Sequence, residues 1–399
     1  MLYLKFLFVL TILLTLVGCG GSGGGGDFSV PTQIVPVLSN SSVEGKDYDL
    51  ISVQYSPARS AILDLFDHFS IHFNTNEVRN NPSIFEQDQN IKLKGYNLNS
   101  LKNGLGTITL STSNSANQLT DLAVTPDGAV GVFSLDNLKN TSPVLGVFIE
   151  STKKSVLSTS LFVGDWGFIS LSSAGKGVVA QLSLSYDVVK EFGEVSEGYG
   201  FSTTISGNVA ASAIKVQTSN ITLNSDRDRL LFLNSSWHVG VNESIAISPS
   251  GTGALNDRLS ILMKTSEKST FNATYNVSQW TAFSPTSNRS TVNRTGLVLS
   301  EIIQQGSLTF TGSRVTLKNI IDLADRETNF TRVEGGLAGV GGHMLRFDPN
   351  FEGNNIDFKF RFFVSKDEEF LVGLDYDNDG DSPLAKASRA TFIIGIKQH

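Results

Sequence analysis

Short runs in which apolar and polar residues alternate make up most of the chain beyond residue 69. The clearest is the stretch 356–362, whose apolar positions are Ile356, Phe358, Phe360 and Phe362. The positions between them are Asp357, Lys359 and Arg361. Successive side chains of a strand point to opposite faces, so this pattern predicts strands with one apolar and one polar face. Similar runs, such as 370–374 and 391–396, predict a mainly β protein.

One stretch has a helical period instead. Ser56 can cap a helix and Pro57 suits its first position, and apolar residues then recur at spacings of three and four. We therefore expect a helix at about residues 57–68. From Phe69 the period changes to two, which predicts a strand directly after the helix.

The length of 399 residues fits two folded domains. Pro126-Asp127-Gly128 lies between two strand-like runs and predicts a tight hairpin turn. Polar residues around Lys153 suggest a domain boundary near residue 155. We expect a small N-terminal α+β unit over residues 43–155. A larger antiparallel domain over 156–399 follows, and its short strands fit a β-sandwich or a β-barrel equally well.

The N-terminus predicts export. A short basic segment precedes an apolar run from Phe6 to Val17, which is too short for a comfortable transmembrane helix. The run ends in Leu16-Val17-Gly18-Cys19, which resembles the lipobox of bacterial lipoproteins. The resemblance implies a signal peptide over residues 1–18, cleavage before Cys19 and acylation of Cys19. Gly20 at the next position implies transport to the outer membrane, on its periplasmic face or at the cell surface.

Residues 19–42 are glycine-rich at first and then polar and unpatterned. A flexible coil of this length reaches about 25–30 Å, so it would tether the folded body to the membrane. Cys19 is the only cysteine of the chain, and its acylation would leave the folded body without disulfides.

Composition narrows the classes of partner. The formal net charge is −7, and loss of Lys5 with the signal peptide makes the mature chain one unit more negative. This acidic balance argues against binding nucleic acid or an anionic lipid surface. Only 17% of the residues are charged, and serine, threonine, asparagine and glycine replace them, as in secreted β proteins.

One acidic stretch is a candidate ion site. Asp375, Asp377, Asp379 and Asp381 alternate with other residues, and Gly380 occupies the sixth position. The spacing resembles the first half of an EF-hand-type calcium loop, but the twelfth position carries Lys386 where that loop has a glutamate. A calcium ion here, with a structural role, would need one more ligand. The nearby acids in the sequence are Asp367, Glu368 and Glu369.

Two further motifs are weaker. Gly164-Asp165-Trp166 resembles the Gly-x-Trp that opens lipocalin-type barrels. That resemblance implies that Trp166 packs across a barrel floor and that the interior takes an apolar ligand. His68 and His72 are four positions apart, which on a helix would suit a zinc pair, but the change of period between them indicates that they do not share a face.

The sequence contains no nucleophile elbow and no paired-histidine metalloprotease motif. We therefore expect a lipid-anchored, non-enzymatic module that binds an envelope ligand or protein partner. Two alternatives stay open at this point: a hydrolase acting on envelope glycan or lipid, and a scaffold for an outer-membrane complex.

Overall fold

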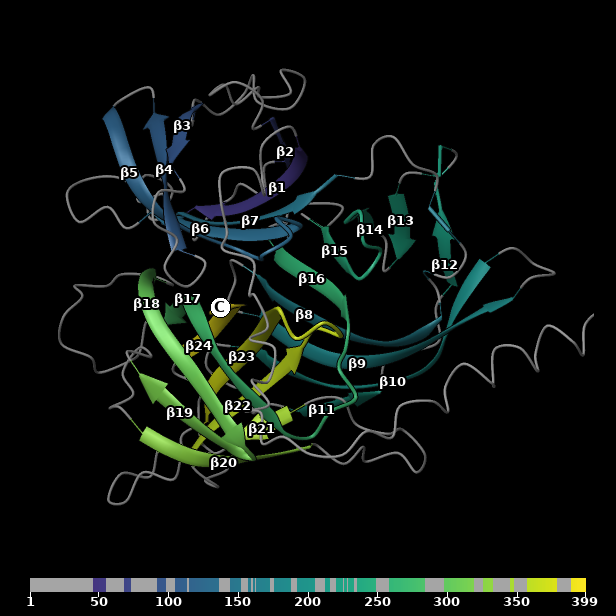
Figure 1. Cartoon of the computed structure of the whole chain (residues 1–399). Helices are drawn as coiled ribbons and strands as arrows, with labels where there is room; N and C mark the ends of the chain where they lie inside the picture. Colours follow the sequence, from purple (N-terminus) through teal and green to yellow (C-terminus); the bar gives the residue numbers. More distant parts are fainter. Residues whose placement is uncertain are drawn as a thin grey trace, which may run out of the picture. The chain divides into compact units, whose positions relative to one another are not determined.

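The computed structural model describes residues 46–54, 68–72, 92–97, 105–112, 115–135, 144–151, 157–158, 161, 163–172, 176–187, 192–204, 212–215, 220–224, 226–227, 229–232, 235–248, 258–283, 298–318, 326–332, 345–347, 357–378 and 389–399. Val37–His399 forms one compact unit. The described residues of this unit fall into three consecutive groups of antiparallel strands, which we call the first, second and third modules (Figure 1).

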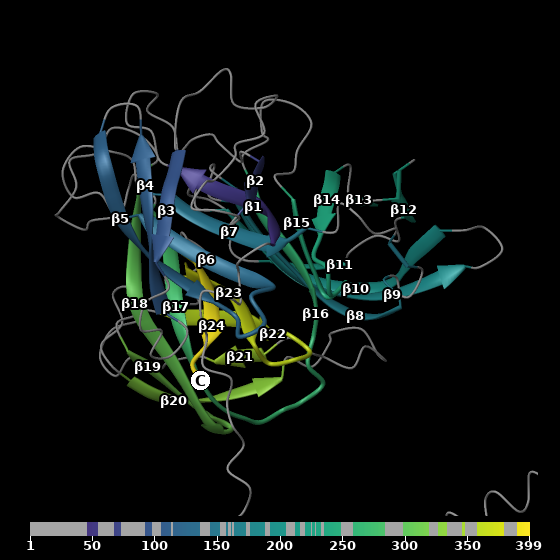
Figure 2. The same cartoon turned by 45° about the horizontal axis from the view of Figure 1, so that its top comes forward.

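The first module is a seven-stranded sheet. Its strands are β1 (Asp47–Gln54), β2 (His68–His72), β3 (Lys92–Asn97), β4 (Leu105–Thr112), β5 (Ser115–Val124), β6 (Val130–Leu135) and β7 (Val144–Glu150). Each strand from β3 to β6 pairs with the next one in the chain, and the last strand, β7, pairs with the first, β1 (Figure 2). Among the described residues, β2 and β3 are the two ends of the sheet.

The second module contains nine strands. They are β8 (Gly164–Ser172), β9 (Lys176–Asp187), β10 (Phe192–Thr204), β11 (Ser212–Lys215), β12 (Asn220–Leu223), β13 (Arg229–Phe232), β14 (Ser235–Val239), β15 (Ile245–Ser248) and β16 (Arg258–Lys264). Following the pairs from β8 through β9, β10, β12 and on to β16 leads back to β8, so eight of the strands close a ring. Strand β11 pairs with β10 outside this ring.

The third module is a closed barrel. Its strands are β17 (Phe271–Phe283), β18 (Val298–Gly312), β19 (Arg314–Lys318), β20 (Arg326–Arg332), β21 (Leu345–Phe347), β22 (Asp357–Val364), β23 (Phe370–Asn378) and β24 (Arg389–Lys397). As in the other modules, the last strand pairs with the first.

The three modules repeat one hairpin turn. The turns are Thr125–Val130, Gly240–Ile245 and Ser365–Phe370, and in each the first N–H donates to the last carbonyl at 2.8 Å. In each, the fourth residue has a positive φ: Gly128 at 70°, Glu243 at 51° and Glu368 at 64°. The carbonyl of the fifth residue accepts a hydrogen bond from the N–H of the residue that ends the last strand of the module, which is Glu150, Lys264 or Lys397. The predicted turn at 126–128 is confirmed as the first of these.

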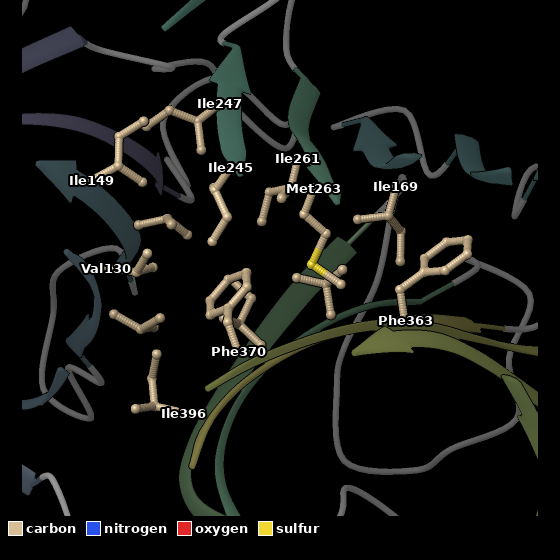
Figure 3. Packing of buried hydrophobic residues seen from close by; sticks show 14 of the residues in the cluster. Val130, Ile149, Ile169, Ile245, Ile247, Ile261, Met263, Phe363, Phe370 and Ile396 are labelled. Carbon is tan, nitrogen blue, oxygen red and sulfur yellow. The ribbon is translucent and has the colours of Figure 1, made fainter. Parts of the chain in front are cut away.

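The repeat extends to the buried residues. Tyr48, Trp166 and Tyr275 are fully buried in the first strands of their modules, in register with Glu150, Lys264 and Lys397 of the last strands. Each module also sends residues from the strand after its turn and from its last strand into one shared apolar core. These residues are Val130, Val132, Val147, Ile149, Ile245, Ile247, Ile261, Met263, Phe370, Val372, Ile394 and Ile396. Figure 3 labels eight of them, namely Val130, Ile149, Ile245, Ile247, Ile261, Met263, Phe370 and Ile396.

Backbone contacts join consecutive modules at these turns. The N–H of Val241 donates to the carbonyl of Glu150, and the N–H of Lys366 donates to the carbonyl of Lys264, both at 3.0 Å. The corresponding residue of the first turn is Pro126, which has no N–H to donate. The first module is thus joined to the second, and the second to the third, by the same hydrogen bond.

The strand faces that point away from the shared core pack inside each module. One pair of cross-strand positions shows how the two side chains divide the space between them. The cross-strand neighbours are Gly131 and Phe148 in the first module, Ala246 and Leu262 in the second, and Leu371 and Gly395 in the third. A large residue on one strand thus faces a small one on its neighbour. Interiors are close-packed, so the summed volume matters more than which strand carries the bulk.

The mainly β, antiparallel fold predicted from the alternating pattern is confirmed. Of the two architectures left open for the larger domain, a closed barrel is what β17–β24 form. The expected boundary near residue 155 falls between β7 and β8, and the residues after it divide between the second and third modules. The helix expected at 57–68 lies outside the described residues, except for His68, which begins β2.

One detail of the predicted pattern is wrong. Phe360 and Phe362 lie inside the third module as expected, but Arg361, on the face predicted to be polar, is only 4% exposed. That face of β22 also carries Phe363, which packs in the shared core. The pattern of a single strand does not reveal that a neighbouring module covers its polar side.

Candidate functional site in the second module

The interior of the second module is built around two tryptophans. Trp166 from β8 and Trp237 from β14 are both buried, and the ring of Phe168 meets that of Trp237 edge-on at 5.9 Å. Lys264, in register with Trp166 on the last strand, holds its ammonium 5.3 Å from the Trp166 ring centroid. Burial lowers the pKa of Lys264, while nearby Glu243 acts in the opposite direction. The cation and ring attract each other at this end of the module.

Trp166 carries a buried donor that is not satisfied. Its Nε1–H has no hydrogen-bond partner among the described residues. The corresponding phenols are satisfied, because Tyr48 donates to the carbonyl of Gly128 and Tyr275 to that of Glu368, both at 2.7 Å. A buried donor without a partner costs about 1–3 kcal/mol, so an acceptor brought to this indole would be stabilising.

The end of the module near Trp166 is covered by the segment that precedes β8. Leu157 and Leu161 are buried in the interior cluster of the second module. The N–H and hydroxyl of Ser158 donate to the two carboxylate oxygens of Glu243 at 2.8 and 2.7 Å. The described residues of this segment therefore pack against one end of the ring of strands.

A layer of serines lies further along the interior. Ser170 follows Phe168 by two positions, Ser260 precedes Leu262 by two, and strand alternation places them on the same inner face as these apolar residues. The Ser260 hydroxyl donates to that of Ser170 at 3.0 Å, and both residues are 1% exposed. Ser248, two positions beyond Ala246 and also buried, donates to a strand carbonyl at 2.9 Å.

The third module is filled differently. Its interior cluster includes the aromatic residues Phe271, Tyr275, Phe310, Phe330, Phe360 and Phe362. The ring centroids of Phe310 and Phe330 lie 5.4 Å apart, and those of Phe310 and Phe362 lie 5.6 Å apart. Such contacts are those of a packed core. Ser260 of the second module corresponds in position to Ile393, an apolar member of this core.

The structure places the Gly164-Asp165-Trp166 motif at the start of the first strand of the second module's ring, with Trp166 packed inside. This agrees with the position expected from the lipocalin-type motif. The apolar ligand that the resemblance implies stays a prediction. Gly164 itself has φ of +119°, a conformation that side chains rarely adopt.

The candidate calcium residues are only partly described. Asp375 and Asp377 occupy alternate positions of β23, opposite Phe360 and Phe358 of β22, while Asp379 and Asp381 lie outside the described residues. Within the described ranges no group of three acidic, histidine or cysteine side chains could hold a metal. Calcium binding stays a prediction.

The extra calcium ligands considered from the sequence precede the candidate residues along the chain. Asp367, Glu368 and Glu369 lie in the turn before β23, whereas the candidate loop begins near its end. Six positions separate Glu369 from Asp375, which is about 20 Å along an extended strand, so these three acids are distant from Asp375 and Asp377. Glu369 is also paired with Lys397 at 3.3 Å.

The remaining predicted residues do not meet in a site. Cys19 lies outside the described residues. His68 and His72 are the two ends of one strand, β2, and not the end of a helix followed by a strand as expected. No helix in the described part of the chain is long and apolar enough to cross a membrane.

Sequence reasoning missed one buried pair of ionisable residues. Asp49 on β1 and His238 on β14 are 3% and 4% exposed, and Oδ2 of Asp49 lies 3.3 Å from Nδ1 of His238. The two residues are 189 positions apart, and neither belongs to a motif. Only the packing of the first module against the second brings them together.

No protein-family model and no curated protein matches the chain. Among solved structures, those of transferrin-binding protein B show a weak similarity to the chain. For isotype 1 of this protein from serogroup B Neisseria meningitidis, the identity is 8%, the TM-score 0.26, and the alignment covers 88% of this chain and 76% of that one. Intact Ap-TbpB, with N and C lobes, gives 8% identity, a TM-score of 0.25 and coverages of 89% and 76%.

A mutant of the vaccine antigen transferrin-binding protein B from Haemophilus parasuis Hp5 gives 8% identity, a TM-score of 0.23, and coverages of 89% and 75%. Likeness at this level assigns neither an activity nor a partner to the chain.

Proposed function

We propose that this chain is a lipid-anchored, non-enzymatic binding protein of the bacterial outer membrane, and that the interior of its second module holds a small, largely apolar ligand. The anchor would be the acylated Cys19, and the glycine-rich tether would hold the body away from the lipid. The ligand would lie among the serines and tryptophans of the second module.

The observation that carries the ligand site is the difference between the two closed modules. Among the described residues, six aromatic side chains pack inside the third module, whereas the second has a buried serine layer and an indole N–H with no hydrogen-bond partner. The serine hydroxyls are hydrogen-bonded within the module, which offsets the cost of placing them in an apolar interior. Binding sites are typically apolar with a few convergent polar groups, which is the composition of this interior.

Probe binding tests the ligand site. The mature chain without its acyl group is titrated with anilinonaphthalene sulfonate, and energy transfer from tryptophan to the bound probe is recorded. Ser170→Leu with Ser260→Leu fills the interior and is expected to weaken binding at least tenfold, a loss of about 1.4 kcal/mol. Gln279→Leu, a buried polar residue of the third module, is the matched control and leaves binding unchanged. Equal binding by the filled variant contradicts this site.

Localisation tests the anchor separately. Cells are labelled with palmitate, and Cys19→Ala is expected to abolish labelling and to release the protein from the outer-membrane fraction. Protease digestion of intact cells, with a periplasmic protein as control, then tells whether the body faces outward. Labelling that persists in Cys19→Ala would contradict the proposed anchor.

A further inference from the structure

The contact between the first and second modules contains the buried pair Asp49–His238. Their side chains lie 3.3 Å apart, and each also has further polar or ring contacts. Asp49 follows Tyr48, the buried aromatic residue of its first strand, and His238 precedes Val239, the last residue before the repeated turn. These two positions recur in the other modules, so the contact can be compared with its counterpart.

The counterpart between the second and third modules is apolar. There Gly167 follows Trp166, and Phe363 precedes Val364. A Cβ atom on Gly167 would lie 2.5 Å from Cγ of Phe363, so the ring of Phe363 packs directly on the glycine backbone. The same architectural contact is therefore made once by a carboxylate and an imidazole, and once by a glycine and a phenyl ring.

We propose that Asp49 and His238 form a proton-dependent latch that holds the first module on the second. Aspartate and a neutral imidazole together carry one negative charge. When the pair holds one additional proton, it has no net charge. Losing that proton leaves a buried negative charge, and gaining another leaves a buried positive charge. Both are costly away from water, so the contact holds best while the pair keeps one proton.

The pH range follows from counting protons. In the unfolded chain aspartate takes up a proton below about pH 4, and histidine releases one above about pH 6.5. A folded pair that keeps its single proton binds fewer protons than the unfolded chain in acid and more in alkali. Stability from this pair therefore falls below about pH 4 as the pH drops, and falls above about pH 6.5 as it rises.

Other ionisable residues occur on the strands next to Asp49 and His238. On the side of Asp49 these are His68 and His72 of β2, and Glu150, which is paired with Lys46. On the side of His238, Arg229 of β13 is its cross-strand partner. Lys264 ends β16, a strand that contacts β1. Their effects cancel when two variants that both keep them are compared.

The test replaces the polar contact between the first and second modules by the apolar contact found between the second and third. The melting temperature of the parent is compared, from about pH 3.5 to pH 9, with that of Asp49→Gly/His238→Phe, which has the residues of the next contact. The melting temperature of the parent relative to that of the variant is expected to be highest between about pH 4 and 6.5. This difference is expected to shrink below and above that range. A second variant, Asp49→Asn/His238→Gln, keeps polar side chains that do not titrate and is expected to behave like the first.

Two results would overturn the latch. One is a difference between parent and variants that does not change with pH. The other is a difference that grows steadily toward alkaline pH, which would mean that the folded pair holds no extra proton. Nitrogen NMR shifts of His238 give an independent measure, and a ring protonated on both nitrogens at about pH 7.5 supports the proposal.

Discussion

Adding one methyl group at Gly131 tests the complementary packing inside the modules. Gly131 on β6 faces Phe148 on β7, and a Cβ atom there would lie 2.0 Å from Cζ of the phenyl ring. Ordinary contacts between carbon atoms are about 3.5–4 Å. The ring cannot move away freely, because Phe148 is fully buried and meets Tyr48 edge-on at 5.1 Å.

Overpacking of this kind costs about 1–3 kcal/mol, so Gly131→Ala is expected to lower the free energy of unfolding by that amount. The second module shows how the chain accommodates an alanine here, since Ala246 faces a leucine, Leu262. Gly131→Ala/Phe148→Leu recreates that pair. The loss of unfolding free energy in the double variant is expected to be about 1–2 kcal/mol smaller than the sum of the losses in the two single variants.

The assay is urea unfolding followed by circular dichroism on the parent, both single variants and the double variant. Gly240→Ala is the control, because its Cβ would approach no heavy atom closer than 3.4 Å. Its stability is expected to stay within about 1 kcal/mol of the parent. The reasoning is refuted if Gly131→Ala matches Gly240→Ala, or if Phe148→Leu gives no rescue.

Three further predictions follow from other parts of the structure. Burial raises the pKa of Tyr275 well above its usual value, so the folded phenol keeps its proton when the unfolded one ionises near pH 10, and stability falls above that pH. Tyr275→Phe is expected to lower the free energy of unfolding by about 1 kcal/mol at neutral pH, because it removes the phenol hydrogen bond. The variant is also expected to show a smaller decrease of this free energy above about pH 10 when urea unfolding is followed as a function of pH. Gly167→Ala is expected to cost about 1–3 kcal/mol, and Phe363→Leu to relieve part of that loss in the same assay. Millimolar calcium is expected to raise the melting temperature, and Asp377→Ala/Asp379→Ala to abolish the shift; an unshifted parent contradicts the calcium site.

Local patterns predicted the local structure well. The alternation at 356–362 and the apolar runs after residues 370 and 391 correspond to β22, β23 and β24. The turn at Gly128 was recognisable because proline, aspartate and glycine favour tight turns. The turns at Glu243 and Glu368 have the same backbone but no glycine at the positive-φ position, so composition did not reveal them.

Of the candidate ligand site, the sequence indicated only Trp166, through its Gly-x-Trp motif. The serine layer was not predictable, because Ser170 and Ser260 become neighbours only when β8 and β16 close the ring. The Asp49–His238 pair was equally invisible, since it depends on contact between two modules.

The sequence by itself determined the strands, the first of the repeated turns and the expectation of export, because these depend on neighbours within a few residues. Tertiary structure decided that the strands form three modules around one core, and that Arg361 is buried on its polar face. Tertiary structure also revealed that the three modules repeat the same packing with different residues. Gly131–Phe148, Ala246–Leu262 and Leu371–Gly395 fill equivalent space with different residues, since packing constrains the summed volume of two facing side chains and leaves each identity free.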